Sequence, residues 1–306
     1  MEVRPQALTA IWEEDPLPNL EIGASFNIEP LVVGGSDAKV VPEAVKNWTF
    51  FDGALMVLIV KSAHGLTAIG TVVAIAPGLA VGATHTMSSD LDSLVAGESS
   101  AFCVGPTERG LELWRVRHLS VTEADDILYL SLEAAFEMPD GWRLRTLPLT
   151  SRAPIAGERL TVVGFRMPSV SENEQSIRVE GNLLAASGHV TAVYHPMRDR
   201  VLMPFPTIEI QCGALGGMSG GAVLDAHGHL LGVVSRSLGT DDGEGPTYAA
   251  WIVGCLNREV RLPWPPGLYP LPVHLLDVDS RLLCLEGRDK IRVTGPNTTE
   301  YRVWFT

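Results

Sequence analysis

Basic residues are scarce in this sequence. Its 306 residues include 23 Lys and Arg against 36 Asp and Glu, which gives a formal net charge of −13. A nucleic-acid-binding surface needs clustered positive charge to neutralise phosphates, so we expect no nucleic-acid partner. An excess of acidic residues more often serves solubility than recognition.

Cysteines are also few, and they lie far apart. Cys103, Cys212, Cys255 and Cys284 form no CxxC pair, so neither the disulfide framework of a small secreted domain nor a zinc site is indicated. Disulfides between distant cysteines remain open at this stage. The first residues lack the basic and then apolar layout of a signal peptide. We therefore predict a protein of the reducing cytoplasm that uses no metal and no cofactor.

Charged residues are missing altogether from residues 62–89. A stretch of this length suggests a membrane span. However, Pro77 and Gly78 form a turn signal in its middle, and the flanking runs are short and rich in β-branched residues. Two buried strands joined by a tight turn explain the stretch better, so we expect no membrane partner.

No long helical pattern precedes residue 252. The chain contains 30 Gly and 21 Pro, is 46% hydrophobic and 19% charged, and so reads as a folded protein of many short strands and turns. Continuous apolar runs indicate buried strands, whereas the alternating run at 111–117 indicates a half-exposed one. The first set of predicted strands covers residues 54–60, 69–75, 79–83, 111–117 and 127–132.

A second set of strand patterns follows a connection that contains proline and arginine. These strands are predicted at 159–165, 177–184, 189–194, 207–211, 221–224, 230–235 and 247–252, with a short helix at 252–260. Two successive sets of about six strands predict two tandem antiparallel β-barrels, and hence an all-β fold.

Composition suggests four segments. Residues 1–47 form an N-terminal extension, 48–150 the first barrel, 151–262 the second, and 263–306 a proline-rich linker with a β-rich tail. The tail is too short to hold a core of its own, so we expect it to pack on the barrels or on a partner. The extension could be a regulatory arm, but a packed extension is the simpler interpretation.

A serine in a glycine-rich turn is the clearest candidate for chemistry. The sequence from Gly216 to Val223 places Ser219 between glycines, directly before an apolar strand. Such a turn exposes the hydroxyl and lets backbone N–H groups converge beside it, which is what acyl transfer needs. A glycine-rich turn alone is weak evidence, so a base and an orienting acid are required elsewhere.

His85 and Asp126 are the candidates for those roles. His85 follows the end of a buried strand, a rigid mount for a proton-transfer group, although a lone histidine is by default structural. Asp126 directly precedes a buried strand, where a carboxylate can hold an imidazole in one tautomer. Its neighbour Asp125 is expected to be a solvated turn acid. His85 and Asp126 then belong to the first barrel and Ser219 to the second, so the site lies between barrels, a natural place for a cleft.

Four motifs in this order resemble the chymotrypsin/trypsin-fold serine peptidases, and more closely their compact bacterial, HtrA-like branch. The resemblance covers about residues 48–262. Any one of the motifs is weak evidence alone, but four in register are specific. They are Ala83-Thr84-His85, Asp126-Ile127-Leu128-Tyr129-Leu130, Gly217-Met218-Ser219-Gly220-Gly221 and Leu231-Gly232-Val233-Val234-Ser235-Arg236-Ser237.

The resemblance implies a role for each matched residue. Ser219 would be the nucleophile, His85 the general acid and base, and Asp126 its orienter. The N–H groups of Gly217 and Ser219 would form the oxyanion hole. Ser235 matches a family serine that hydrogen-bonds the aspartate.

The same resemblance implies a substrate-binding region. Ser235, Arg236 and Ser237 would pair with an extended peptide by β-strand addition. Gly213 stands where an acid would select Arg or Lys, so no such preference is predicted. Thr247 would line the opposite wall of the pocket and favour a small or medium apolar side chain.

Two departures from the secreted members of the family concern activation. Those members carry an aspartate directly before the nucleophile, where it receives a newly cut N-terminus, but this chain has Met218. The segment Val32-Val33-Gly34-Gly35 resembles such an N-terminus but follows Leu31 rather than a basic residue. Activation by N-terminal clipping is therefore not expected.

We thus predict an intracellular trypsin-like serine endopeptidase that cleaves protein or peptide substrates through an acyl-enzyme. It would be regulated by a partner protein or a flanking segment. The alternative is a protease fold that kept its peptide groove but lost turnover, since a fold alone does not fix a function.

Overall fold

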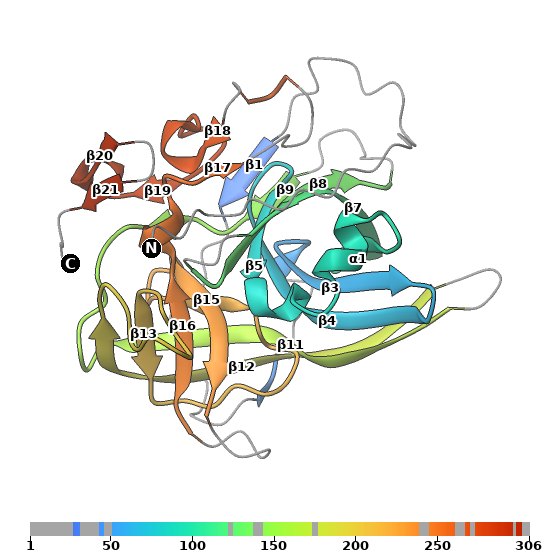
Figure 1. Ribbon diagram of the computed structural model, residues 1–306, viewed down its shortest axis with the longest axis horizontal. Helices are drawn as coiled ribbons and strands as arrows, with labels where there is room; N and C mark the ends of the chain where they lie inside the picture. Colours follow the sequence, from blue (N-terminus) through green and yellow to red (C-terminus); the bar gives the residue numbers. More distant parts are fainter. Residues whose placement is uncertain are drawn as a thin grey trace.

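The computed structural model describes residues 27–30, 43–45, 51–121, 125–136, 143–172, 177–238, 245–260, 267–269, 273–295 and 298–301. The segment Val32-Val33-Gly34-Gly35 lies outside them. Strands dominate the described part (Figure 1).

The first barrel closes from six antiparallel strands. In spatial order they are β3 (Leu55–Ser62), β4 (Gly65–Ala76), β5 (Leu79–Ala83), β8 (Ile127–Ala134), β7 (Gly110–Ser120) and β6 (Ser100–Thr107). The uncharged stretch supplies β4 and β5, joined at Pro77 and Gly78 as expected, and Gly78 takes a φ of 64°. Within the described residues no helix is long and apolar enough to cross a membrane.

The second barrel closes in the same way. Its six strands are β11 (Arg159–Glu172), β12 (Ile177–Tyr194), β13 (Thr207–Ile210), β16 (Thr247–Trp251), β15 (Leu230–Ser237) and β14 (Ala222–Leu224). β14 pairs antiparallel with both β11 and β15, which closes the ring. The predicted all-β double barrel is therefore confirmed, including the very low helix content.

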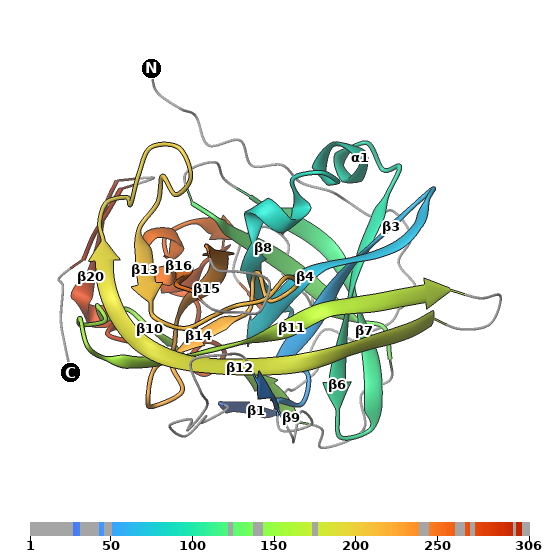
Figure 2. The ribbon, with the colours of Figure 1, turned by 90° about the horizontal axis from the view of Figure 1, so that it is seen from below.

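One strand is longer than its sequence pattern suggests. Residues 177–184 and 189–194, expected as separate strands, form the single strand β12, which pairs with β11 and then with β13. The β11–β12 hairpin reaches from the second barrel across β3, β6 and β7 of the first (Figure 2). One cluster of buried apolar side chains continues through both barrels, from Ile59 and Val81 to Val162 and Val233.

The flanking segments pack on the barrels. β1 (Asn27–Pro30) pairs with β9 (Arg143–Thr146), and β2 (Glu43–Ala44) adds to the edge of β12. The helix expected at 252–260 is only the 3₁₀ turn η3 (Ile252–Cys255), because Glu259 and Val260 form β17. Short helical turns also occur at η2 (Thr84–Met87), α1 (Leu91–Val95), η4 (Leu275–Asp277) and η5 (Arg288–Lys290).

The C-terminal tail is β-rich and joined to the body, as predicted. Leu275, Val278 and Leu283 are buried in the shared core. β19 (Leu285–Glu286) pairs with β10 (Leu149–Thr150), and the Tyr269 hydroxyl donates to the Pro77 carbonyl at 2.6 Å. The remaining strands are β18 (Val273–His274), β20 (Ile291–Gly295) and β21 (Thr298–Tyr301).

Candidate active site

His85 is fixed to Asp126 by two hydrogen bonds. The chain leaves β5 at Ala83 and turns at once into η2, which holds His85. The backbone N–H of His85 donates to Asp126 Oδ1 at 2.9 Å, and its ring Nδ1 lies 2.7 Å from Asp126 Oδ2. The imidazole is 29% exposed and the carboxylate 8%. With Asp126 ionised, Nδ1 carries the proton and Nε2 is left as an acceptor.

Asp126 is held in turn by the second barrel. The Ser235 hydroxyl donates to Asp126 Oδ2 at 2.5 Å. Ser235 occupies a bulge in β15, because the register with β16 shifts between Val234 and Arg236. Bulges next to active sites often re-aim a side chain, and here the bulge residue reaches across to the first barrel.

The expectation that Asp125 is a solvated turn acid is wrong. Its carboxylate accepts from Arg258 Nη1 at 3.0 Å, and both side chains are only 12% exposed. Arg258 also donates to the Ile127 carbonyl, and its guanidinium lies 4.3 Å from the centre of the Tyr129 ring. Arg258 therefore clamps both chain neighbours of Asp126. Sequence reasoning missed Arg258 because it lies far from Asp126 in the chain, in the short segment that follows β16.

The turn that carries Ser219 is built on two glycines in the left-handed region. Gly217 has a φ of 92° and Gly220 a φ of 81°. Met218 N donates to the Leu215 carbonyl at 3.0 Å, so Gly217 holds the third position of a four-residue turn, where a positive φ defines type II. Ser219 itself is partly exposed. In the described part of the chain, neither Gly217 N nor Ser219 N donates a hydrogen bond, so both amides are free for a ligand.

Close backbone contacts bring this turn to the end of β5. A Cβ built on Gly220 would lie 2.1 Å from the Thr71 carbonyl and 2.9 Å from Ala83 N. Ala83 directly precedes η2, which carries His85. On the other side, Gly220 N donates to the Val234 carbonyl at 2.7 Å, next to Ser235. The turn therefore lies at the junction that holds His85 and Asp126. Among the hydrogen bonds of the described residues, none joins the Ser219 hydroxyl to the His85 ring.

Thr71 is the second residue that sequence reasoning missed. It lies on β4 and is 1% exposed. Its backbone N–H donates to the Ser219 carbonyl at 2.8 Å, and its hydroxyl donates to the Gly217 carbonyl at 3.0 Å. A signal for it existed, because it is the sole hydroxyl in the apolar run from Ile69 to Ile75 and a buried polar group needs a partner.

The predicted substrate-binding residues are distributed along β15 and β16. The Ser235 hydroxyl donates its hydrogen bond to Asp126. The Arg236 side chain is exposed, and Ser237 is partly exposed. On the side of β15 that faces β14, ladder pairing ends at Val233. Gly213 is buried. Thr247 is fully buried and donates its hydroxyl to the Cys212 carbonyl at 2.7 Å. The binding roles of these residues stay predictions.

The cysteines form no disulfide, and in the described part of the chain they belong to no metal-binding cluster. All four cysteines are free. Burial raises the pKa values of Cys212 and Cys255 to about 12, so these thiols stay protonated near neutral pH. Among the described residues, no group of three His, Cys, Asp or Glu side chains is arranged to hold a metal ion.

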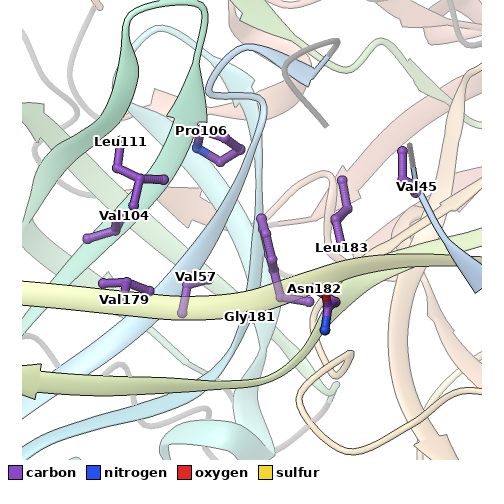
Figure 3. A pocket seen from close by; sticks show the side chains of 10 residues that line it. Val45, Val57, Val104, Pro106, Leu111, Val179, Gly181, Asn182 and Leu183 are labelled. Atoms are coloured by element: carbon purple, nitrogen blue, oxygen red, sulfur yellow. The ribbon is translucent and has the colours of Figure 1, made fainter. Parts of the chain in front are cut away.

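A separate cavity of about 170 Å³, lined mainly by apolar residues, lies between the first barrel and the long hairpin. Val57, Val104 and Pro106 line it from the barrel, and Val179 and Leu183 from β12 (Figure 3). It contains none of the candidate catalytic side chains.

A family model described as a trypsin-like peptidase domain matches residues 70–233, which is more than half of the chain. That range contains His85, Asp126 and Ser219. A search of curated proteins gave no match.

Several solved structures match part of this chain, at low sequence identity. The HtrA-type protease AlgW with decapeptide is 14% identical with a TM-score of 0.45, over 67% of this chain and 63% of that chain. A serine endoprotease from Yersinia pestis is 15% identical with a TM-score of 0.39, over 65% and 58%. The human heparin binding protein is 16% identical with a TM-score of 0.48, over 69% and 91%. The chain thus covers less than two thirds of the HtrA-type structures.

Proposed function

The chain belongs to the trypsin-like peptidase domain family, and from this premise we propose that it is a serine endopeptidase with Ser219, His85 and Asp126 as its triad. One observation carries the proposal. The Asp126 carboxylate hydrogen-bonds both the ring and the backbone N–H of His85, and the Ser235 hydroxyl of the other barrel donates to Asp126. The serine turn lies beside them, and its Gly217 and Ser219 amides donate to no acceptor among the described residues. A structural histidine would not need this arrangement.

In the proposed mechanism the Ser219 hydroxyl attacks the scissile carbonyl and passes its proton to His85 Nε2. Asp126 stabilises the resulting imidazolium. The N–H groups of Gly217 and Ser219 hold the oxyanion of the tetrahedral intermediate. His85 then protonates the leaving amine as the C–N bond breaks, which leaves an acyl-enzyme. A water molecule, deprotonated by His85, hydrolyses the ester and restores Ser219.

The proposed substrate is an extended segment of a protein or peptide. It would add as a strand to the edge of β15 at Ser235, Arg236 and Ser237, where main-chain hydrogen bonds supply affinity. Gly213 offers no charge for an Arg or Lys side chain. Thr247 would line the opposite wall of the pocket, which would favour a small or medium apolar side chain.

Labelling with a fluorophosphonate probe tests this proposal, because the probe reacts only with an activated serine. We expect wild type to be labelled once per chain and Ser219→Ala not at all. Ser89→Ala removes an exposed hydroxyl elsewhere and should label as wild type. An unlabelled wild type, with or without candidate activators, contradicts the proposal. Peptide-library cleavage by the labelled enzyme would then define specificity.

The absence of a Ser219–His85 hydrogen bond among the described residues favours one alternative, a peptide-binding module without turnover. This alternative predicts that Ser219→Ala binds peptides as tightly as wild type does, and that wild type leaves bound peptides intact. An endopeptidase predicts cleavage products from wild type alone.

We further propose that the protein works in the cytoplasm and is controlled by a partner protein or by a flanking segment. Met218, directly before Ser219, is fully buried and carries no charge to receive a cut N-terminus. The tail is the flanking segment with contacts that support this idea, because Glu286 lies near His229 in the turn between β14 and β15.

A further inference from the structure

The serine turn of the second barrel is held by a single residue of the first. Thr71 N donates to the Ser219 carbonyl at 2.8 Å, and Thr71 Oγ1 donates to the Gly217 carbonyl at 3.0 Å. The same hydroxyl accepts from Phe165 N at 2.9 Å. It is therefore used both as donor and as acceptor, inside a site where Thr71 is 1% exposed.

These bonds fix particular peptide planes of the turn. The plane between Gly217 and Met218 is held at its carbonyl by the Thr71 hydroxyl and at its N–H by the Leu215 carbonyl at 3.0 Å. The plane between Ser219 and Gly220 is held at its carbonyl by Thr71 N. Two of the planes around the nucleophile thus depend on Thr71.

The preceding plane, between Gly216 and Gly217, has no such restraint. Its N–H donates to no acceptor among the described residues, and this is the amide proposed to bind the oxyanion. Type I and type II turns differ by a flip of the central peptide. Whether that N–H faces the site therefore depends on how firmly the following plane is held.

We propose that Thr71 is a positioning residue whose hydroxyl keeps the Gly217 amide directed at the oxyanion. Without the hydroxyl, the Gly217 carbonyl loses its donor, and the central peptide of the turn is free to flip. Met218 provides no substitute, because its sulfur only accepts from Leu215 N at 3.3 Å within the same turn. The catalytic consequence rests on the proposed peptidase function, whereas the holding of the turn does not.

Three variants separate the hydroxyl from the bulk of the side chain. Thr71→Val removes the hydroxyl and keeps the branched shape, and Thr71→Ser keeps the hydroxyl. Thr207→Val is the matched control, since Thr207 is a fully buried strand threonine whose hydroxyl donates to the Phe205 carbonyl at 2.8 Å. We expect Thr71→Val to lower kcat about 10- to 100-fold with little change in KM, because oxyanion stabilisation acts only in the transition state. Thr71→Ser and Thr207→Val should stay within about threefold of wild type.

Hydrogen exchange measured by NMR gives a readout that needs no turnover. In Thr71→Val the amide of Met218 should exchange about three- to tenfold faster, as expected for the loss of one hydrogen bond, and it should not in Thr207→Val. If Thr71→Val exchanges faster but wild type neither labels nor cleaves, the peptidase proposal is removed and the holding role stays intact. Unchanged exchange in Thr71→Val overturns the inference, as does an unchanged kcat in an active enzyme.

Discussion

Asp126 uses both carboxylate oxygens to serve one histidine. Oδ1 accepts from the backbone of His85, while Oδ2 faces both the His85 ring and the Ser235 hydroxyl. The backbone bond sets the distance and the ring bond sets the tautomer. Ser235 then prevents the carboxylate from rotating away. In the proposed mechanism, this arrangement would prepare the pair for proton transfer before a substrate arrives.

Asp126→Asn should lower kcat about 10⁴-fold with a smaller change in KM, because an amide N–H opposite Nδ1 forces the wrong imidazole tautomer. Ser235→Ala removes one bond to the same carboxylate and should cost only about tenfold. Steady-state kinetics on a peptide substrate provide the test. Equal losses for the two variants would contradict the tautomer argument.

At the scale of elements, the site depends on how closely the serine turn approaches β4 and β5. Gly220 lies so near their backbones that a Cβ has no room, and its φ of 81° is itself strained for other residues. Gly97 has a similar φ of 73° but has open space where a Cβ would stand. The two glycines therefore separate backbone strain from steric clash.

Gly220→Ala should destabilise the fold by about 2–5 kcal/mol, combining left-handed strain with overpacking. Gly97→Ala should cost only about 1–2 kcal/mol, from strain alone. Urea unfolding of both variants measures the difference. If the two losses match, the close approach of the turn is not what demands glycine at position 220.

The strands and the placement of His85 beside Asp126 were predictable because each depends on local signals. Continuous apolar runs marked the barrel strands, and His85 and Asp126 stand where such runs end or begin. Contacts between distant residues were not predictable. Asp125 was assigned to solvent because its partner Arg258 lies in another segment, and the Thr71 hydroxyl gave no sign that its acceptor is Gly217. Likewise, β12 is continuous because β13 takes over as its partner, which no local pattern reveals.

At the scale of the whole molecule, a partly buried charge cluster joins the tail to the second barrel. Arg152, 3% exposed, pairs with Glu158 and lies 2.9 Å from Asp225. His229 Nδ1 lies 3.6 Å from Asp225 and 3.5 Å from Glu286 of the tail. Thr150 donates to the same Glu286 carboxylate at 2.8 Å. Asp225 and His229 of this cluster lie in the turn between β14 and β15. β14 follows Ser219 in the chain, and β15 contains Ser235.

His229 makes this junction sensitive to pH. The Asp225 carboxylate raises the pKa of His229 above its ordinary value of 6.5, Glu286 adds to the rise, and burial and Arg152 oppose it. Burial alone would raise the pKa of Asp225, but hydrogen bonds from His229 and Arg152 bring it well below its usual range, so it stays ionised. A raised folded-state pKa stabilises the fold fully below pH 6.5 and ceases to do so as the pH rises through that pKa.

Removing the tail's charge should therefore flatten this pH dependence. We expect Glu286→Gln to lose stability relative to wild type at pH 5.5 and to approach wild type at pH 8.5, as measured by urea unfolding. His64→Asn, at an exposed histidine, should keep the wild-type profile. If the tail restrains the catalytic half, Glu286→Gln should also change the rate of peptide cleavage most at the lower pH. A parallel stability profile for Glu286→Gln and wild type would show that His229 does not sense the tail.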